Sequence, residues 1–345
     1  MATVTSTKGY TDDDLTHFHG QLAKANMRGQ WQNEAVRSTG QTGVWDDRCF
    51  LPKAGGQGHL WPWSDVRPFL EESCVAVPES NTSRRAIMFN NPALAKGTTN
   101  TINMGIQMIQ PGETAWAHRH SIAALRFVIQ GHPDLTTVVD GAVCPMEDFD
   151  LVLTPNWSWH DHHNRSDRPV YWLDVLDVPL VLGLNQTFYE DFGAKEQAPR
   201  AAGSSGPKLR FPWRDVQQIL RNQAAQHTYQ PEGSLHDYVN PHLNGATGGA
   251  TVPTLLCRAQ WLSPGLATKT LRRTSSAVYF VLRGEGVTEV DGQELRWGKN
   301  DCFVVPNWTR HRHVNQSKSS EAVLFSVHDT PVLKALGLYR EEAQI

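Results

Sequence analysis

The chain has 345 residues, of which 39% are hydrophobic and 12 are tryptophan, so it is long enough for two domains with well-filled cores. Its net charge of −3, without a dominant Lys/Arg run, argues against a nucleic-acid partner and favours a small molecule. No stretch approaches the roughly 20 apolar residues of a membrane span, and the N-terminus lacks the apolar core of a signal peptide. The five cysteines are scattered, without a CxxC pair, which is typical of reduced thiols in a cytoplasmic protein.

An N-terminal helix is predicted from Thr11 to about Met27. Thr11 is a good capping residue, and three aspartates follow it where the helix dipole favours negative charge. The polar, Gly-rich residues after it are predicted to be a loop. We therefore expect an N-terminal helix and loop arm over residues 1–59.

From residue 60 onward the chain repeats itself. The phrase LWPWSDVRPFL at 60 is answered by LRFPWRDVQQIL at 209, and TPNWSWHDHHN is answered by VPNWTRHRHVN. The offset is 153 residues between Gly112 and Gly265, and 151 between Pro155 and Pro306. Such a long period predicts a duplicated domain. We expect one barrel over 60–192, a Gly/Ala/Ser/Pro-rich linker over 193–208, and a second barrel over 209–345.

Each copy consists mainly of short apolar or alternating runs. The runs before Asp140-Gly141 and Asp291-Gly292 predict hairpin strands with Asp-Gly turns. The runs after the two DVP and DTP segments predict short helices. The fold class is therefore all-β, two duplicated jelly-roll barrels with a few short helices. The tryptophans at 61, 63, 157, 159 and 172 are expected in the core.

Two histidines in the first copy lie one residue apart in a segment that otherwise indicates a strand. Side chains at i and i+2 of a strand share a face, so His118 and His120 can share one metal ion. His160, in TPNWSWHDHHN, is the candidate third ligand.

The spacing of these histidines between Gly112, Gly131, Pro155 and Asn164 resembles the two-part cupin signature. Ala124 stands where the broad cupin pattern carries a glutamate ligand. The phrases HRHSIAALRF, TPNWSWHDHHN and WLDVLDVP resemble the gentisate 1,2-dioxygenase family, with its salicylate and hydroxynaphthoate relatives, from about residue 61 onward. The resemblance implies a bicupin with one Fe(II) per chain, held by His118, His120 and His160. Three imidazoles leave room for a chelating substrate and for O2.

The resemblance also implies arginines that bind the substrate carboxylate. Arg126 is one candidate, and Arg84 and Arg85 are two more. Adjacent residues on a strand face opposite ways, so we expect only one of the pair 84/85 to reach the pocket.

Three further positions are expected at the pocket wall. Gly105 and Gln107 match family wall positions, although Gly105 could be a tight-packing glycine. Asn103 stands where a salicylate-cleaving relative carries a bulky aromatic residue. A smaller amide suits a ring with a polar 5-substituent.

His162 and Asp174 are candidates for the catalytic step. By resemblance, His162 acts as an acid or base near oxygen and Asp174 orients it. A solvent-facing position in a His-rich loop is the equal alternative for His162, and the expectation for His163.

The duplication provides a comparison within the chain. His118-Arg119-His120 becomes Leu271-Arg272-Arg273, so the second copy lacks two of the three ligands. We predict one metal in the first barrel and none in the second. Arg126 and Asp174 change together with the ligands, to Tyr279 and Ser326. Gln107 and His162 persist, as Gln260 and His313, which favours an architectural part for them.

The function predicted from these features is opening of a 2-hydroxybenzoate ring between its carboxyl-bearing and hydroxyl-bearing carbons with O2. The substrate is expected to be gentisate or another 5-substituted salicylate such as 5-nitrosalicylate. The alternatives are a non-catalytic cupin that binds an aromatic acid, and a different metal-dependent bicupin enzyme. By resemblance we expect a homo-oligomer, a tetramer. The charge and the lack of a long apolar stretch lead us to expect no nucleic-acid or membrane partner.

Overall fold

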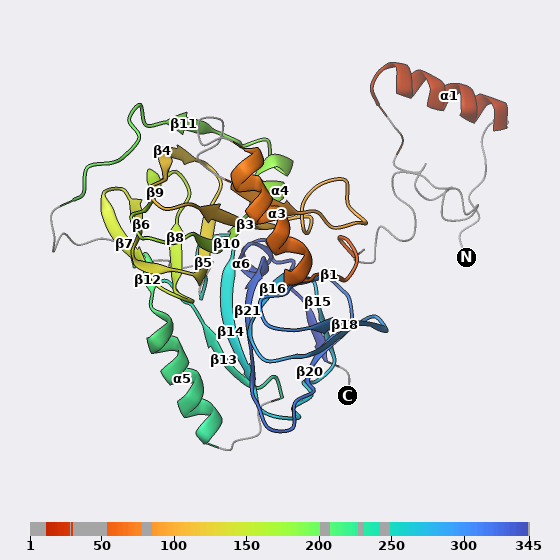
Figure 1. Ribbon diagram of the computed structural model, residues 1–345. Coiled ribbons are helices and arrows are strands. Elements are labelled where there is room, and N and C mark those ends of the chain that lie inside the picture. The colour runs from red at the N-terminus through yellow and green to blue at the C-terminus, as the bar shows by residue number, and fades with distance from the viewer. Residues whose placement is uncertain are drawn as a thin grey trace. The chain divides into compact units, whose positions relative to one another are not determined.

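The computed structural model describes residues 12–27, 29, 54–77, 85–200, 208–226, 231–241 and 249–343. The chain divides into two units, Met1–Lys53 and Ala54–Ile345 (Figure 1). In the first unit, helix α1 (Asp12–Lys24) confirms the predicted N-terminal helix. Its expected cap, Thr11, and most of the predicted loop lie outside the described residues.

The described residues of the second unit form four antiparallel sheets, two for each copy of the repeat (Figure 1). The six-stranded sheet of the first copy has the order β12 (Arg210–Phe211), β8 (Leu151–Thr154), β5 (Ala124–Gln130), β10 (Val170–Leu176), β3 (Asn103–Ile109), β2 (Arg85–Phe89). Its five-stranded sheet has the order β11 (Tyr189–Asp191), β4 (Thr114–His120), β9 (His160–Asn164), β6 (His132–Val139), β7 (Ala142–Met146).

The second copy repeats this arrangement. Its six-stranded sheet has the order β1 (His59–Trp61), β19 (Cys302–Val305), β16 (Ala277–Arg283), β21 (Ala322–His328), β14 (Leu256–Leu262), β13 (Ser234–Asp237). Its five-stranded sheet has the order β18 (Gln293–Trp297), β17 (Gly286–Val290), β20 (His311–Asn315), β15 (Leu271–Arg273), β22 (Glu341–Ala343). The predicted all-β architecture of two jelly-roll barrels is confirmed.

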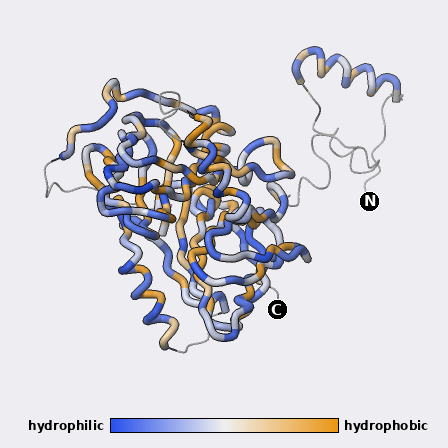
Figure 2. Tube along the Cα trace, in the orientation of Figure 1, coloured by the Kyte–Doolittle hydropathy of each residue, from blue (hydrophilic) through white to orange (hydrophobic). Residues whose placement is uncertain are grey.

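The two six-stranded sheets share the largest hydrophobic core. Along β5, Leu125 and Phe127 face this shared core, whereas Val128 belongs to the separate core inside the first barrel. Phe127 stacks on Phe325 of the second barrel, with ring centres 3.9 Å apart. Hydrophobic segments accordingly converge in the middle of the unit (Figure 2). β5 is therefore largely apolar on both faces, and Arg126 is its one charged residue, which lies beside Thr154 and His160 in the first barrel.

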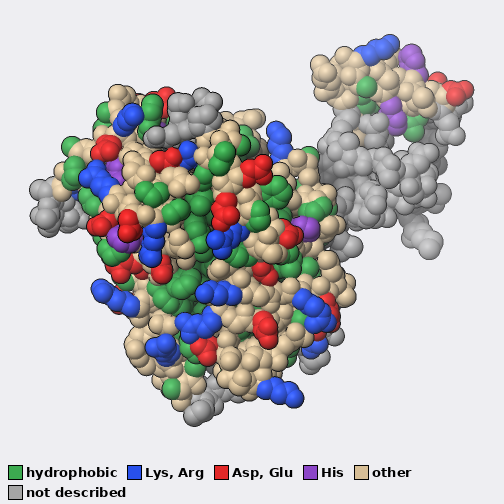
Figure 3. Space-filling view, viewed as in Figure 1, with side chains coloured by type: hydrophobic (Ala, Val, Ile, Leu, Met, Phe, Trp, Pro, Cys, Tyr) green, Lys and Arg blue, Asp and Glu red, His purple; other side chains and the backbone are tan. Residues whose placement is uncertain are grey.

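Helices accompany the strands at equivalent places in the two copies. α3 (Trp63–Ala76) and α5 (Trp213–Ala225) each begin after a proline and carry an aspartate in the first turn, an arrangement the two matching phrases share. α4 (Val178–Gly183) and α6 (Thr330–Ala335) confirm the predicted short helices. None of the helices in the described ranges is long and apolar enough to cross a membrane. Charged side chains of both signs are interspersed over the visible face (Figure 3).

The hairpin turns have the predicted conformation. Asp140 and Gly141 have φ of 46° and 79°, and Asp291 and Gly292 have φ of 46° and 86°. Both central residues of each turn are left-handed, as in a type I′ turn. The β6–β7 and β17–β18 hairpins therefore follow from their Asp-Gly pairs.

The first strand of each copy pairs with the sheet of the other copy. β1 pairs with β19, with His59 opposite Val304, and β12 pairs with β8, with Arg210 opposite Val152. The N–H of Trp63 donates to Asp301 at 2.8 Å, and that of Trp213 donates to Asp150 at 2.8 Å. The two barrels are thus joined by a reciprocal exchange, and the division at residues 60 and 209 stays a prediction.

Candidate metal centre

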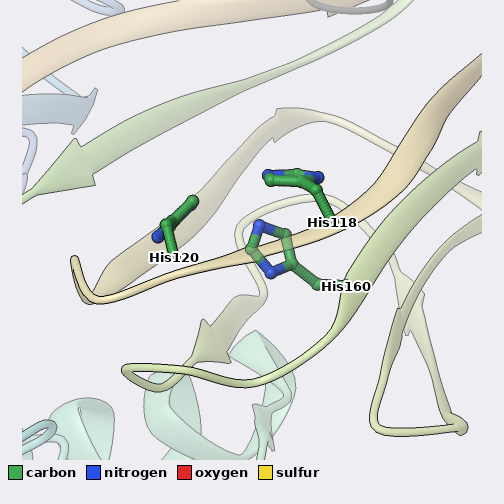
Figure 4. A group of neighbouring side chains, drawn as sticks. All are labelled: His118, His120 and His160. Atoms are coloured by element: carbon green, nitrogen blue, oxygen red, sulfur yellow. The ribbon is translucent and has the colours of Figure 1, made fainter. Parts of the chain in front are cut away.

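Three histidines gather at one end of the first barrel, two from β4 and one from β9 (Figure 4). One ligand atom of each can lie within 4.8 Å of the others. β4 and β9 are neighbours, and His118 lies directly opposite His160 in the register. The i, i+2 spacing on β4 places His120 on the same face. The ring centres are 4.1 Å apart for His118 and His160, and 4.9 Å apart for His120 and His160.

Each imidazole is held from behind by a backbone carbonyl two residues away. The Nδ1 atoms of His118, His120 and His160 lie 2.8, 2.8 and 2.9 Å from the carbonyl oxygens of residues 116, 122 and 158. An imidazole that donates from Nδ1 presents its Nε2 lone pair to a metal, so these bonds select one tautomer and orient each ring. The three rings form a preorganised set of nitrogen donors.

His160 shows that the residues fit a metal ion. Its Nε2 is buried and makes no hydrogen bond within the described part of the chain, which is rare for a buried polar atom unless another group occupies the site. Burial lowers the pKa of His160 well below its ordinary value, and the positive charge of Arg126 lowers it further. The ring is therefore neutral and ready to bind a metal.

Carboxylates do not complete the cluster within the described residues. Ala124, in the position of the usual glutamate, is fully buried on β5 opposite Thr154. Three imidazole donors on one side leave the other coordination positions of a metal open to exogenous ligands.

A charged pair lies on the wall beside the histidines. Arg126 on β5 and Asp174 on β10 are opposite each other in register, and Nε of Arg126 lies 3.8 Å from Oδ1 of Asp174. Arg126 also donates from Nη1 to the hydroxyl of Thr154. These contacts hold a buried guanidinium on a strand whose other face is hydrophobic core.

β3 contributes three predicted wall residues that share one face. Gln107 is 1% exposed, and neither its Nε2 nor Oδ1 of Asn103 has a hydrogen-bond partner among the described residues. Gly105 lies opposite Asp174, and a Cβ there would come within 2.4 Å of the carbonyl oxygen of Ile87. The close approach of β2 explains this glycine by packing alone.

Arg85 is engaged elsewhere. Its Nη1 lies 2.5 Å from Oε2 of Glu113, and its Nε donates to the carbonyl of Val77. On β2 it pairs with Met108, which belongs to the core shared by the barrels, so its side chain is not on the face of Gln107. Arg84 lies outside the described residues.

His162 and His163 differ from the solvent-facing alternative. Both lie on β9, all five residues of which are buried. His162 is 1% exposed, and its Nδ1 lies 2.7 Å from the hydroxyl of Thr137. His163 is 4% exposed, with Nε2 2.5 Å from Asp161. The expectation of a solvent-facing His163 was wrong.

The segment 193–200 explains this burial. Gln197 donates from its backbone N–H and from Nε2 to Oδ2 of Asp161, at 3.0 and 2.9 Å, and the carbonyl of Lys195 accepts from Ala117. The start of the predicted linker thus covers the outer face of β4 and β9. Residues 201–207 lie outside the described part.

Trp157 was also assigned wrongly to the core. Trp172 is fully buried, but Trp157 is 42% exposed. It contacts the side chain of Arg119, between the two histidines of β4.

Sequence reasoning did not single out Thr137, Thr154, Tyr189 or Arg119. Thr137 and Arg119 are repeated in the second copy as Thr288 and Arg272, so a search for residues repeated beside the histidines could have found them. Tyr189 on β11 has its ring 5.5 Å from that of His118, at 23°. Only the pairing of β11 with β4 reveals this contact.

The equivalent place in the second barrel holds an ion-pair network. Arg273, at the position of His120, binds Glu232 at 2.6 Å and Glu341 at 2.7 Å. Leu271 occupies the position equivalent to His118. The cavity lined by Leu271, Arg273 and His311 is only about 10 Å³. His311 persists, but burial lowers its pKa to about 4, so it is a neutral core histidine.

Comparison with known proteins decides the family. The Cupin domain family model matches residues 105–176 and 262–328. A 1-hydroxy-2-naphthoate 1,2-dioxygenase from Nocardioides sp. is 37% identical over 96% of this chain and 88% of its own, and a 5-aminosalicylate 1,2-dioxygenase from Comamonas sp. is 40% identical over 96% and 90%. The chain belongs to the gentisate 1,2-dioxygenase family. A gentisate 1,2-dioxygenase from Aquipseudomonas alcaligenes is 34% identical over 94% of this chain and 95% of its own.

Solved structures agree with this assignment. Salicylate 1,2-dioxygenase from Pseudaminobacter salicylatoxidans has a TM-score of 0.83 at 28% identity, over 98% of this chain and 99% of that chain. The same enzyme has also been solved with gentisate, at a TM-score of 0.82 and 27% identity, over 99% of this chain and 97% of that chain. The predicted bicupin fold and the predicted class, a ring-cleaving 1,2-dioxygenase, are confirmed.

Proposed function

We propose that the chain uses O2 and one Fe(II), held by His118, His120 and His160, to open a 2-hydroxybenzoate ring between its carboxyl-bearing and hydroxyl-bearing carbons. The observation that carries this proposal is the preorganised set of three imidazoles, which no carboxylate of the described residues completes. Imidazoles with open positions suit iron, and when bound it would supply the redox chemistry that couples the aromatic ring with O2. The remaining tasks belong to the protein.

Arg126 is proposed to bind the substrate carboxylate. It is buried beside the histidines, and its planar fork can donate two parallel hydrogen bonds to a carboxylate. Asp174 and Thr154 hold the guanidinium in place before substrate arrives. We assign the second carboxylate contact to Arg84 rather than Arg85, because Arg85 is already paired with Glu113.

His162 is proposed to hold a proton for the reaction. Thr137 fixes its Nδ1, so Nε2 is the atom that would accept or donate the proton. We propose that Asp174 helps to set the charge around it.

Asn103 is proposed to meet the 5-substituent of the ring. Its Oδ1 is buried without a partner in the described structure and can accept from a hydroxyl or amino group, while its amide can donate to a nitro group. The relative named for 5-aminosalicylate is 40% identical to this chain. We therefore propose a 2-hydroxybenzoate with a polar 5-substituent as the substrate, opened to an oxo-diacid, which is maleylpyruvate when gentisate is the substrate.

The test is oxygen uptake by anaerobically reconstituted iron protein mixed with gentisate, 5-aminosalicylate, 5-nitrosalicylate and salicylate, with ring absorbance followed in parallel. We expect uptake with 5-substituted substrates to exceed that with salicylate, and no uptake by His118→Ala. Asn103→Ala should reduce this preference roughly twofold to tenfold, the effect of one lost hydrogen bond. Absence of uptake with all four compounds would end the proposal.

We further propose a cytoplasmic homo-oligomer, a tetramer. Large apolar side chains around β11 are exposed, among them Leu184, Phe188 and Phe192, and a second copy of the chain would cover them. The cysteines at 74, 144, 257 and 302 are free thiols, as a reducing compartment would keep them. Light scattering of the purified protein measures the assembly directly.

A further inference from the structure

Arg119 lies in sequence between the two histidines of β4 and projects from the opposite face of the strand. Its guanidinium carbon is 4.5 Å from the ring centre of Trp157 and 4.4 Å from that of Trp159. Its Nε and Nη2 donate to Oε2 of Glu190 at 2.8 and 2.6 Å. We call these four residues the arginine clamp. The clamp joins β4 to the turn before β9 and to β11.

The turn held by the clamp orients the third histidine. Trp157 and Trp159 flank Ser158, whose carbonyl accepts from Nδ1 of His160. The backbone N–H of Trp157 also donates to the carbonyl of His120 at 2.8 Å. A shift of this turn would therefore move His160 relative to the two histidines of β4.

The turn needs support because its backbone is strained. Trp157 has φ of 64°, the left-handed region, which a bulky side chain rarely adopts. Such a conformation persists only where the surroundings hold it. Stacking of a cation on the exposed indole, together with the bond to His120, supplies that restraint.

The ion pair between Arg119 and Glu190 connects the clamp to β11. Glu190 pairs with Arg119 in the register of β11 and β4, with Tyr189 opposite His120. This pairing brings the Tyr189 ring against that of His118. The clamp thus connects the elements that set all three imidazoles.

The second barrel carries a reduced form of the clamp. Arg272 lies 4.3 Å from the ring of Trp308, and its Nε and Nη2 donate to Glu342 at 2.8 and 2.6 Å. Trp308 has φ of 59°. The side chains of Arg119 and Arg272 are 26% and 27% exposed. The difference is the second tryptophan, because Arg310 stands in the place of Trp159.

We propose that Arg119 is a positioning residue for the metal centre, holding the three imidazoles in a geometry that binds a metal tightly through the clamp formed with Trp157, Trp159 and Glu190. This inference rests on the proposed metal site. Arg119 would act through the segments that its contacts with Glu190, Trp157 and Trp159 hold in place.

The matched variants Arg119→Gln and Arg272→Gln test the proposal, with the Kd for Co²⁺ measured on metal-stripped protein by visible absorbance. Loss of a partner that orients ligands typically weakens metal binding 10- to 100-fold, so we expect the Kd of Arg119→Gln to rise about tenfold or more. Arg272→Gln should stay within about twofold of the parent chain. Both should lower Tm by similar amounts. Arg119→Lys, which keeps the charge but not the planar fork, should give an intermediate Kd.

A Kd for Arg119→Gln equal to that of the parent would overturn the proposal, as would equal weakening by Arg272→Gln. If Arg119→Gln does not fold, Arg119→Lys and Trp159→Phe decide by the same comparison. A parent chain that binds Co²⁺ in this clamp-dependent way but consumes no oxygen as iron protein would refute the proposed function and leave the clamp intact. A parent chain that binds no Co²⁺ would refute both.

Discussion

The bond between His162 and Thr137 has a counterpart in the second barrel. Nδ1 of His313 lies 2.8 Å from the hydroxyl of Thr288, compared with 2.7 Å for the first pair. A buried imidazole needs such a partner in either barrel. What differs is the surroundings, because Arg126 and the three histidines lie beside the first pair only. The same inherited bond can therefore fix a proton-carrying ring in one barrel and a structural ring in the other.

Thr137→Val and Thr288→Val separate these roles. Each removes the hydroxyl that bonds a buried histidine, and Thr288→Val also removes the acceptor of Trp297 Nε1. Each should lower the free energy of unfolding by roughly 1–3 kcal/mol. We expect kcat to fall about tenfold in Thr137→Val only, because its histidine is no longer held for proton transfer. Steady-state kinetics and urea unfolding of both variants provide the measurement. Equal kcat values for the two variants would show that His162 is only structural.

Single residues were predictable where their pattern was local. His118 and His120 share a face because strands have a period of two, and the signature around His160 supplied the third histidine. The errors concern residues whose burial depends on distant segments. Residues 193–200 cover His163 from some thirty positions downstream, and Trp157 faces outward, where it packs on the side chain of Arg119.

At the scale of elements, the same distinction applies. The Asp-Gly hairpins and the short helices after DVP and DTP were predicted because a few adjacent residues determine them. The exchange of β1 and β12 between the barrels was not predicted, because strands of three and two residues are too short to show a hydrophobic pattern of their own. Their pairing depends on a sheet far away in the sequence. β11 and β22, which pair with β4 and β15 at the edges of the two five-stranded sheets, are three residues long and were not predicted for the same reason.

Across the whole molecule, two buried aspartates connect the barrels. Asp177 accepts from the backbone of Ala123 in its own barrel and from the hydroxyl of Thr254 in the other. Asp329 likewise accepts from Ser276 and Thr101. These are the aspartates of the DVP and DTP segments, so the duplication built a reciprocal link between its two halves.

Asp329 should make stability depend on pH. Burial raises its pKa to about 6, above that of the unfolded chain, so the fold favours the neutral carboxyl. The contribution of the neutral Asp329 carboxyl to the free energy of unfolding is complete below about pH 4 and is lost as pH rises through 6. The free energy of unfolding changes by about 3 kcal/mol over this range. Asp329→Asn should remove this dependence. The free energy of unfolding of Asp329→Asn, relative to that of the parent, should be about 3 kcal/mol higher at pH 7 than at pH 4.

Urea unfolding of metal-free parent and Asp329→Asn proteins at both pH values measures this difference. Other titrating groups, including Asp177 and His311, are common to both proteins and cancel in the comparison. A difference in free energy of unfolding that does not change with pH would contradict a raised pKa at Asp329.

We propose that one metal ion binds in the first barrel, on three imidazoles, and none in the second. Elemental analysis of iron-loaded, gel-filtered protein tests it most directly, with His160→Ala and His311→Ala as matched variants at equivalent positions. We expect about one iron per chain in the parent and in His311→Ala, and almost none in His160→Ala. Two irons per chain in the parent, or iron retained by His160→Ala, would contradict it.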